Sequence, residues 1–281
     1  MSHFDVDALL DDRTARVILC LGAGGVGKTT LSAGLALRAA DRGRQVLVVT
    51  IDPAKRLAQA LGLESLDHEP APVAATGDRL NAMMLDTRHA FDAAVTHRLD
   101  PARAARLRDN PFYSSLAESF SGTREYVAME RLGELHRRAV RSGEWDLIVV
   151  DTPPSSSALD FLDGPNRLES LVDSGLMKLL LAASNGGPFA LVRSGANVLA
   201  RMLDLLLGGR LFADLQAFLE VFESVIRGFE SRAVETRAML ASGSARFVVL
   251  AAPEAAPLAE ARTLTERLAA DGLPLGGVIV N

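Results

Sequence analysis

Residues 20–30, CLGAGGVGKTT, decide the fold of this 281-residue chain. Within them, Gly22–Thr29 matches the pattern G-x-x-x-x-G-K-[ST] in full. An apolar stretch precedes the match and an amphipathic stretch follows it, which is the strand–loop–helix setting that the motif requires. Glycines let backbone N–H groups converge on phosphate oxygens, and a helix N-terminus adds partial positive charge. The segment therefore predicts a loop that binds a nucleoside triphosphate; the alternative is a glycine-rich turn without nucleotide.

The residue types in this loop predict individual contacts with the nucleotide. Lys28 can reach the β- and γ-phosphates, which makes it a candidate catalytic residue, and the Thr29 hydroxyl can ligate Mg²⁺. Thr30 is placed for the α-phosphate. The other predicted nucleotide contacts come from the loop itself, at Gly24, Gly25, Val26 and Gly27. A triphosphate with its Mg²⁺ is the expected ligand.

Apolar, β-branched stretches predict six strands, of which the last named is the weakest: residues 16–22, 45–51, 145–151, 246–252, 275–281 and 80–87. Helical stretches separate these candidate buried strands, which is typical of an α/β fold. We predict one P-loop NTPase domain over residues 1–281, with a mostly parallel sheet flanked by helices. Insertions at roughly 88–142 and 164–242 are expected to form a helical subdomain on top, and residues 68–78 a loop.

Composition argues against several classes of protein. The net charge of −5 does not favour a nucleic-acid binder, whose domains usually carry a basic excess. The longest run without Asp, Glu, Lys or Arg is Leu179–Val192, 14 residues, whereas a spanning helix needs about 20 apolar ones. Residues 1–16 are acidic and predict no secretory signal. The single Cys20 is expected to fill the core, with a functional thiol as the alternative, and fits a cytoplasmic protein.

Two aspartates end predicted strands, where ligands of open α/β sheets collect. Asp52 precedes Pro53, a residue suited to the first position of a helix, so an N-cap is its alternative role. Beside the loop, Asp52 is a candidate catalytic residue that orients the attacking water and touches Mg²⁺ through its hydration shell. Asp151 ends an apolar run in the form of a Walker B strand, whose carboxylate holds Mg²⁺. With Thr29, these two carboxylates form the predicted metal site.

Three segments in this order resemble a bacterial member of the arsenite-pump ATPase (ArsA) family, which includes the ATPases that target tail-anchored membrane proteins: GAGGVGKTT (22–30), DPAKRLAQALG (52–62) and DTPPSSSALDFL (151–162). The resemblance covers residues 17–281. It implies ATP at a two-fold dimer interface and a client site in the helical subdomains. It also implies that Asp52 belongs to switch I, that Asp151 belongs to switch II, and that Asn281 reads the adenine edge.

The chain departs from the family pattern in ways that alter the expected activity. Ala23 replaces a lysine that, in the family, reaches the partner's nucleotide, so a homodimer should hydrolyse ATP slowly. A heterodimer with a lysine-bearing paralogue could be competent in this subunit's own site. Lys55 and Arg56 stand where the family commonly has His and Asn, and one of these cations could substitute for the missing lysine. Cys20 alone supplies neither a zinc nor an arsenite site.

We therefore expect an ATP-binding and ATP-hydrolysing dimeric switch that couples nucleotide state to a hydrophobic or membrane-associated client. Two alternatives stay open: a catalytically weak regulatory or scaffold subunit, and a Min- or Par-like partitioning ATPase. An apolar stripe over residues 211–229 predicts either a core-facing helix or the wall of a client groove. Peripheral membrane association is a further option. Because the family normally continues with more sheet and helix, the chain is expected to be truncated after Asn281.

Overall fold

The computed structural model describes six parts of the chain: residues 4–52, 55–86, 89–90, 100–110, 123–153 and 232–281. Most of the second predicted insertion, 164–242, lies outside these parts. So do the apolar stripe over 211–229 and residues 53–54 of the predicted switch I.

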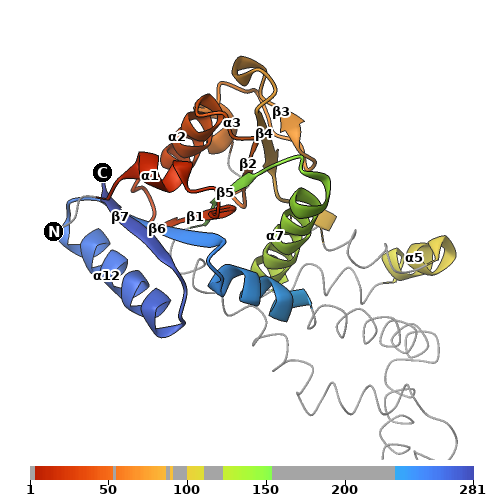
Figure 1. Ribbon diagram of the computed structural model, residues 1–281. Helices are drawn as coiled ribbons and strands as arrows, with labels where there is room; N and C mark the ends of the chain where they lie inside the picture. Colours follow the sequence, from red (N-terminus) through yellow and green to blue (C-terminus); the bar gives the residue numbers. More distant parts are fainter. Residues whose placement is uncertain (1–3, 53–54, 87–88, 91–99, 111–122, 154–231) are drawn as a thin grey trace, which may run out of the picture.

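The described residues form a seven-stranded sheet in the order β3-β4-β2-β5-β1-β6-β7 (Figure 1). All neighbouring strands run parallel except β3 and β4, which are antiparallel. This confirms the predicted mostly parallel sheet. The strands are β1 (Val17–Gly22), β2 (Val46–Thr50), β3 (Ala71–Pro72), β4 (Leu80–Met84), β5 (Leu147–Asp151), β6 (Ala245–Ala251) and β7 (Leu275–Val280).

Helices cover both faces of the sheet. The described helices are α1 (Val6–Asp11), α2 (Lys28–Asp41), α3 (Arg56–Ala60), α5 (Pro101–Arg108), α7 (Thr123–Ser142) and α12 (Ala255–Ala270), with a 3₁₀ turn at Ala74–Thr76 and a helical stretch over 232–241. One apolar cluster joins the sheet to α1, α2 and α3, and a second joins the opposite face to α7 and α12 (Figure 1). A sheet covered on both faces requires strands that are apolar on both faces.

Strand β1 shows how the sequence meets that requirement. All six of its residues are buried. Because side chains alternate along a strand, Val17, Leu19 and Leu21 face the α7 side. Ile18 and Cys20 face the α2 side, so the predicted core role of Cys20 agrees with its place. Burial also raises the pKa of the Cys20 thiol to about 12, which keeps it protonated and unreactive.

Two local predictions were wrong, and one alternative that the sequence left open does not hold. The segment β7 is not buried: it lies at the edge of the sheet and alternates between exposed and half-buried residues. The predicted loop 68–78 contains β3 and the 3₁₀ turn, because Ala71 and Pro72 pair with β4. Helix α3 begins at Arg56 with Lys55 as its N-cap, later than Pro53 suggested, so Asp52 does not cap it.

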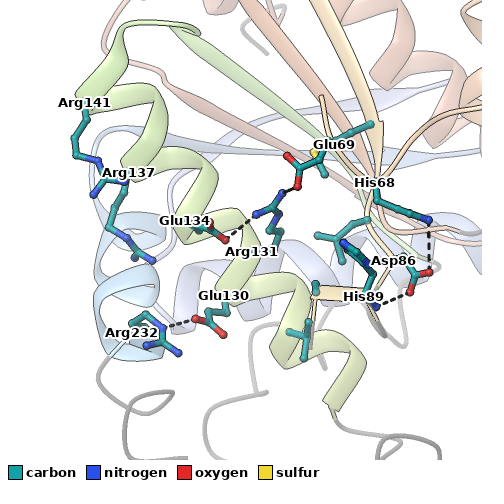
Figure 2. A pocket seen from close by; sticks show the side chains of 14 residues that line it. His68, Glu69, Asp86, His89, Glu130, Arg131, Glu134, Arg137, Arg141 and Arg232 are labelled. Carbon is teal, nitrogen blue, oxygen red and sulfur yellow. Dashed lines mark hydrogen bonds and ion pairs between the residues drawn. The ribbon is translucent and has the colours of Figure 1, made fainter. Parts of the chain in front are cut away.

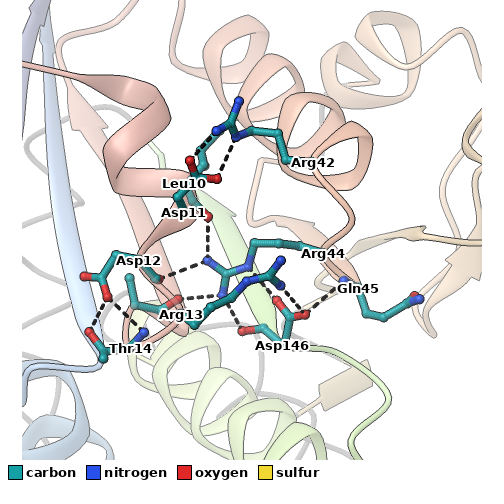
Figure 3. Close-up of polar contacts among 10 residues, drawn as sticks. Leu10, Asp11, Asp12, Arg13, Thr14, Arg42, Arg44, Gln45 and Asp146 are labelled. Carbon is teal, nitrogen blue, oxygen red and sulfur yellow. Dashed lines mark hydrogen bonds and ion pairs between the residues drawn. The ribbon is translucent and has the colours of Figure 1, made fainter.

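At the amino end of the sheet, Arg44 joins three strands through a fully buried guanidinium (Figure 3). Arg44 Nε donates to Asp146 Oδ1 at 2.5 Å, and the terminal nitrogens donate to four main-chain carbonyls, of Leu10, Asp12, Ala15 and Asp146. These residues precede β1, β2 and β5. The contacts therefore fix the N-terminal segment against the sheet at the end opposite the phosphate loop.

In the parts of the chain that the structure describes, no helix is both long enough and apolar enough to span a membrane.

Candidate functional site

The register of three neighbouring strands sets the positions of the residues at the base of the site. Asp151 at the end of β5 is level with Thr50 on β2 and with Cys20 on β1. The chain continues from β1 into the glycine-rich loop, and α2 starts at Lys28. The loop, the first turn of α2 and the ends of β2 and β5 therefore meet at the carboxyl end of the sheet, where ligands of such sheets bind.

Lys28 is buried and lies across the loop. Its Nζ donates hydrogen bonds to the carbonyl oxygens of Gly22 at 2.8 Å and of Ala23 at 2.6 Å. Burial lowers the pKa of Lys28, while the negative charge of Asp151 acts in the opposite direction. The ammonium group is thus fixed beside the carboxylate that the sequence assigned to Mg²⁺.

Asp151 is hydrogen-bonded through only one of its two oxygens. Its Oδ2 accepts from the hydroxyls of Thr29 at 2.9 Å and Thr50 at 3.0 Å. Its Oδ1 is buried and has no hydrogen-bond partner among the described residues. Burial raises the pKa of this carboxyl. A buried carboxylate oxygen without a donor, beside a threonine hydroxyl, fits the oxygen ligands that Mg²⁺ requires.

The loop exposes backbone where a phosphate would bind. Gly24 and Gly25 are exposed, and Thr30 lies exposed on the first turn of α2. Gly27, the N-cap of α2, has φ 91°, a left-handed conformation that favours glycine. Ala23, in contrast, is only 8% exposed and packs in the apolar cluster under α2. The position that holds a lysine in the family pattern therefore presents no charge in this chain.

Asp52 lies next to this group of residues. Its backbone N–H donates to Thr50 Oγ1 at 3.2 Å, and Thr50 in turn donates to Asp151. Asp52 Oδ2 is 3.5 Å from Arg56 Nη1, one turn along the chain at the start of α3. The structure thus brings the two predicted carboxylates together with Lys28 and Thr29, and it adds Arg56 to them.

Asn281 lies at the phosphate loop, at the end of β7. Its Nδ2 donates to the carbonyl of Val26 at 3.3 Å. A Cβ atom on Gly27 would be 2.7 Å from that Nδ2, so the amide touches the loop where no side chain fits. The adenine contact suggested for Asn281 stays a prediction.

The sequence analysis missed two threonines of this site. Thr50 connects Asp52 to Asp151, and Thr152 Oγ1 donates to the carbonyl of Cys20 at 2.6 Å, joining β5 to β1. A hydroxyl residue within two positions of a strand-end aspartate was the available signal. It was too common a pattern to identify either residue without the pairing of the strands.

A cavity of about 350 Å³, separate from the phosphate loop, lies between α7, the end of β4 and residues 68–69 (Figure 2). Ion pairs occupy its wall: Arg131 contacts Glu69 and Glu134, and Arg232 contacts Glu130. Because acids and arginines alternate around it, the cavity has no excess charge that would select an anion or a cation. Its ion pairs connect α7 to neighbouring segments.

Comparisons with known proteins agree with this geometry. The family model described as "Anion-transporting ATPase" matches residues 15–281. "ATPase GET3" of Malassezia globosa is 27% identical over 278 residues, covering 97% of this chain and 74% of that protein. "ATPase get3" of Neurospora crassa is 26% identical over 277 residues, covering 98% and 75%. "ATPase ASNA1 homolog" of Babesia bovis is 30% identical over 177 residues, covering 62% and 45%.

These three relatives are eukaryotic, so the bacterial origin suggested by the resemblance stays a prediction. The family itself follows from a match that spans almost the whole chain and from a phosphate loop with the expected strand, helix and carboxylates around it. The chain belongs to the ArsA family of anion-transporting ATPases.

Proposed function

We propose that this ATPase is a Mg²⁺-dependent dimeric switch whose nucleotide state controls a hydrophobic or membrane-associated client in the cytoplasm. The observation that carries the nucleotide part is the buried Oδ1 of Asp151, which has no hydrogen-bond partner among the described residues. It belongs to a carboxylate that accepts from the Thr29 hydroxyl and interacts electrostatically with the Lys28 ammonium. An oxygen in that state costs free energy in the isolated protein. A bound cation would remove that cost, which supports a metal–nucleotide site.

Each residue at this site receives a role from its position. Thr29 and Asp151 would hold Mg²⁺, which neutralises phosphate charge when bound, with Asp52 contributing through its hydration shell. Lys28 would exchange its loop carbonyls for the β- and γ-phosphates. Asp52 would orient the attacking water. The backbone of Gly24–Gly27 and the Thr30 hydroxyl would bind the remaining phosphate oxygens, and Asn281 would contact the base.

The dimer is proposed because of the resemblance, and Ala23 determines what it would do. A donor supplied in trans to phosphoryl transfer is worth roughly 10³–10⁵ in rate. Since Ala23 is buried and uncharged, this chain would supply no such donor from its loop. A homodimer would therefore be slow. A heterodimer with a lysine-bearing paralogue would be active in the site formed by this chain.

The client is the part of the proposal that depends on the family alone. A hydrophobic or membrane-associated client would bind helical segments inserted into the ATPase domain, at roughly 88–142 and 164–242. Helices α5 and α7 fall in the first of these ranges. A regulatory or scaffold role in a heterodimer is the second candidate, and Ala23 favours it. A partitioning ATPase is the third.

Calorimetry on the full chain tests the nucleotide site. We expect Mg-ATP to bind, removal of Mg²⁺ with EDTA to weaken binding, and Lys28→Ala to abolish it. Circular dichroism of Lys28→Ala controls for folding. A folded wild-type protein that binds no Mg-nucleotide, alone or with its natural partner subunit, would refute the proposal.

Hydrolysis by an Ala23→Lys variant tests the dimer. We expect ATP turnover to rise by about tenfold or more when two copies supply each other with a lysine. The matched control is Ala23→Met, which has a side chain of similar length without charge and meets the same buried surroundings. Turnover that rises equally in both variants, or in neither, would contradict the proposed role of position 23.

A further inference from the structure

We infer that Arg56 is a catalytic residue of this ATPase: its guanidinium leaves Asp52 for the γ-phosphate of ATP bound to the same chain and stabilises the charge that develops there. The inference rests on the proposed nucleotide site. It concerns transition-state charge only, so the guanidinium neither gives nor takes a proton while water attacks phosphorus and ADP leaves.

The position of Arg56 supports this role. It is the first residue of α3, and its Nη1 is 3.5 Å from Asp52 Oδ2, the carboxylate proposed to orient water. The charge of Arg56 also reaches the phosphate loop: burial is the main cause that lowers the pKa of Lys28, and the positive charge of Arg56 acts in the same direction. Arg56 therefore interacts electrostatically with both of the catalytic groups between which the γ-phosphate would lie.

The mobility that the role requires follows from exposure. The Arg56 side chain is 68% exposed, and at 3.5 Å its contact with Asp52 is longer than a charge-assisted hydrogen bond. Ion pairs of such an exposed arginine are weak. A phosphate oxygen offers the same planar guanidinium a more highly charged partner with matching geometry. The exchange of Asp52 for the γ-phosphate is thus favourable on charge and shape.

The reaction also needs a further cation. In phosphoryl transfer, negative charge spreads over the three equatorial oxygens of the γ-phosphate, and enzymes commonly add an arginine beside the metal and the loop lysine. Here Ala23 adds no charge, and Lys28 supplies a single ammonium once it exchanges its two loop carbonyls for phosphate. An arginine that enters from switch I would supply the additional charge in cis.

Single-turnover hydrolysis measures the effect directly. We expect Arg56→Gln to lower the hydrolysis rate constant by about 10³-fold, the lower end of the range for such arginines. Mg-ATP affinity should stay within about threefold of wild type, because the contact strengthens mainly in the transition state. The matched control is Arg13→Gln, which removes an exposed, ion-paired guanidinium at the opposite end of the sheet and should hydrolyse ATP at the wild-type rate.

A double-mutant cycle separates direct contact from positioning of Asp52. The readout is affinity for Mg-ADP with aluminium fluoride, a transition-state mimic, in the wild-type and Asp52→Asn backgrounds. Direct contact predicts that Arg56→Gln weakens this affinity by the same factor in both. An effect that disappears in the Asp52→Asn background would overturn the inference, as would an unchanged rate in Arg56→Gln.

The outcomes also distinguish the inference from the function on which it rests. If wild-type protein binds Mg-ATP and Lys28→Ala does not, the nucleotide site stands. An Arg56→Gln variant with normal turnover would then refute only the role of Arg56. If no Mg-nucleotide binds to the wild type, both proposals fail together.

Discussion

At the amino end of the sheet, the fully buried guanidinium of Arg44 donates to four main-chain carbonyls and to the carboxylate of Asp146. At the carboxyl end, Asp151 is almost as deeply buried, yet only its Oδ2 accepts hydrogen bonds, from Thr29 and Thr50. Each end thus contains a deeply buried charged group, Arg44 at one and Asp151 at the other. The protein satisfies the first, whereas the second retains an oxygen without a donor among the described residues.

This difference in hydrogen bonding distinguishes a buried charge that stabilises the fold from one that is prepared for a ligand. A buried charge contributes to the fold when its hydrogen-bonding groups are paired. A buried oxygen without a partner carries a desolvation cost that persists until a ligand binds. Arg44 should therefore contribute to the free energy of unfolding and little to ATP binding or hydrolysis. Asp151 should contribute to ATP binding or hydrolysis and little to stability. Three substitutions test this contrast, from the largest expected effect to the smallest.

Replacing Arg44 by methionine should lower the free energy of unfolding by about 3–5 kcal/mol. The variant removes the donors of four main-chain carbonyls, which is the main cost, and leaves the partly exposed Asp146 carboxylate with Arg13 as its remaining partner. Urea denaturation measures the loss. Mg-ATP affinity of the remaining folded protein should be unchanged, because Arg44 lies at the opposite end of the sheet.

The matched control is Arg13→Gln. Arg13 pairs with the same Asp146 at 3.1 Å, but its side chain is 55% exposed. Its loss should change the free energy of unfolding by less than about 1 kcal/mol. Equal losses for Arg13 and Arg44 would show that the pairing of a charge at this end, and not its burial, decides its contribution.

Replacing Lys28 by methionine should lower the rate of ATP hydrolysis by about 10³-fold, or about 4 kcal/mol in activation free energy, while the fold persists. Lys28 is a buried cation like Arg44, but its ammonium contacts two loop carbonyls that are expected to release it for phosphate. Steady-state hydrolysis and thermal melting measure the two effects. If Lys28→Met loses as much stability as Arg44→Met, Lys28 contributes mainly to the fold and the expected contrast is wrong.

Replacing Asp151 by asparagine should stabilise the Mg²⁺-free protein at neutral pH by about 1 kcal/mol, because a buried carboxylate no longer has to be kept ionised. The direction of the pKa shift determines how the free energy of unfolding changes with pH. Burial raises the native pKa of Asp151 above its ordinary value of 3.8, so the native state binds the proton more tightly. The free energy of unfolding should therefore fall as pH rises from 3.8 through the native pKa.

Asp151→Asn should remove this part of the pH dependence and also the stabilisation of the wild type by Mg-ATP. Thermal melting between pH 4 and 8, with and without Mg-ATP, measures both. If wild type and variant have the same pH profile and the same response to Mg-ATP, the contrast with Arg44 is wrong.

The nucleotide loop and most of the sheet could be predicted from local sequence. Gly22–Thr29 specifies its own geometry, since glycines and a following helix are all that a phosphate loop needs. Apolar stretches identified the strands because strands buried on both faces read as continuous apolar runs. The same rule failed for β7, since a run of apolar residues does not reveal whether a strand will lie in the centre or at the edge.

Other features depend on contacts between distant segments. Arg44 and Asp146 are 102 positions apart and each looks like a surface charge in the sequence, so only their packing shows that the Arg44 guanidinium is buried and paired with Asp146. Thr50 joins the site because β2 pairs with β5 in a register that sets it level with Asp151. Arg56 Nη1 lies 3.5 Å from Asp52 Oδ2 because helix α3 begins at Arg56.

By itself, the sequence determined that a phosphate loop leads from an apolar strand into a helix, and that aspartates end two further strands. These are local properties, fixed by glycine, lysine and runs of apolar side chains. The tertiary structure decided which buried charge is satisfied and which is not. That outcome depends on strand order, register and the depth of packing, because a hydrogen bond between distant segments exists only when the whole sheet holds its donor and acceptor together.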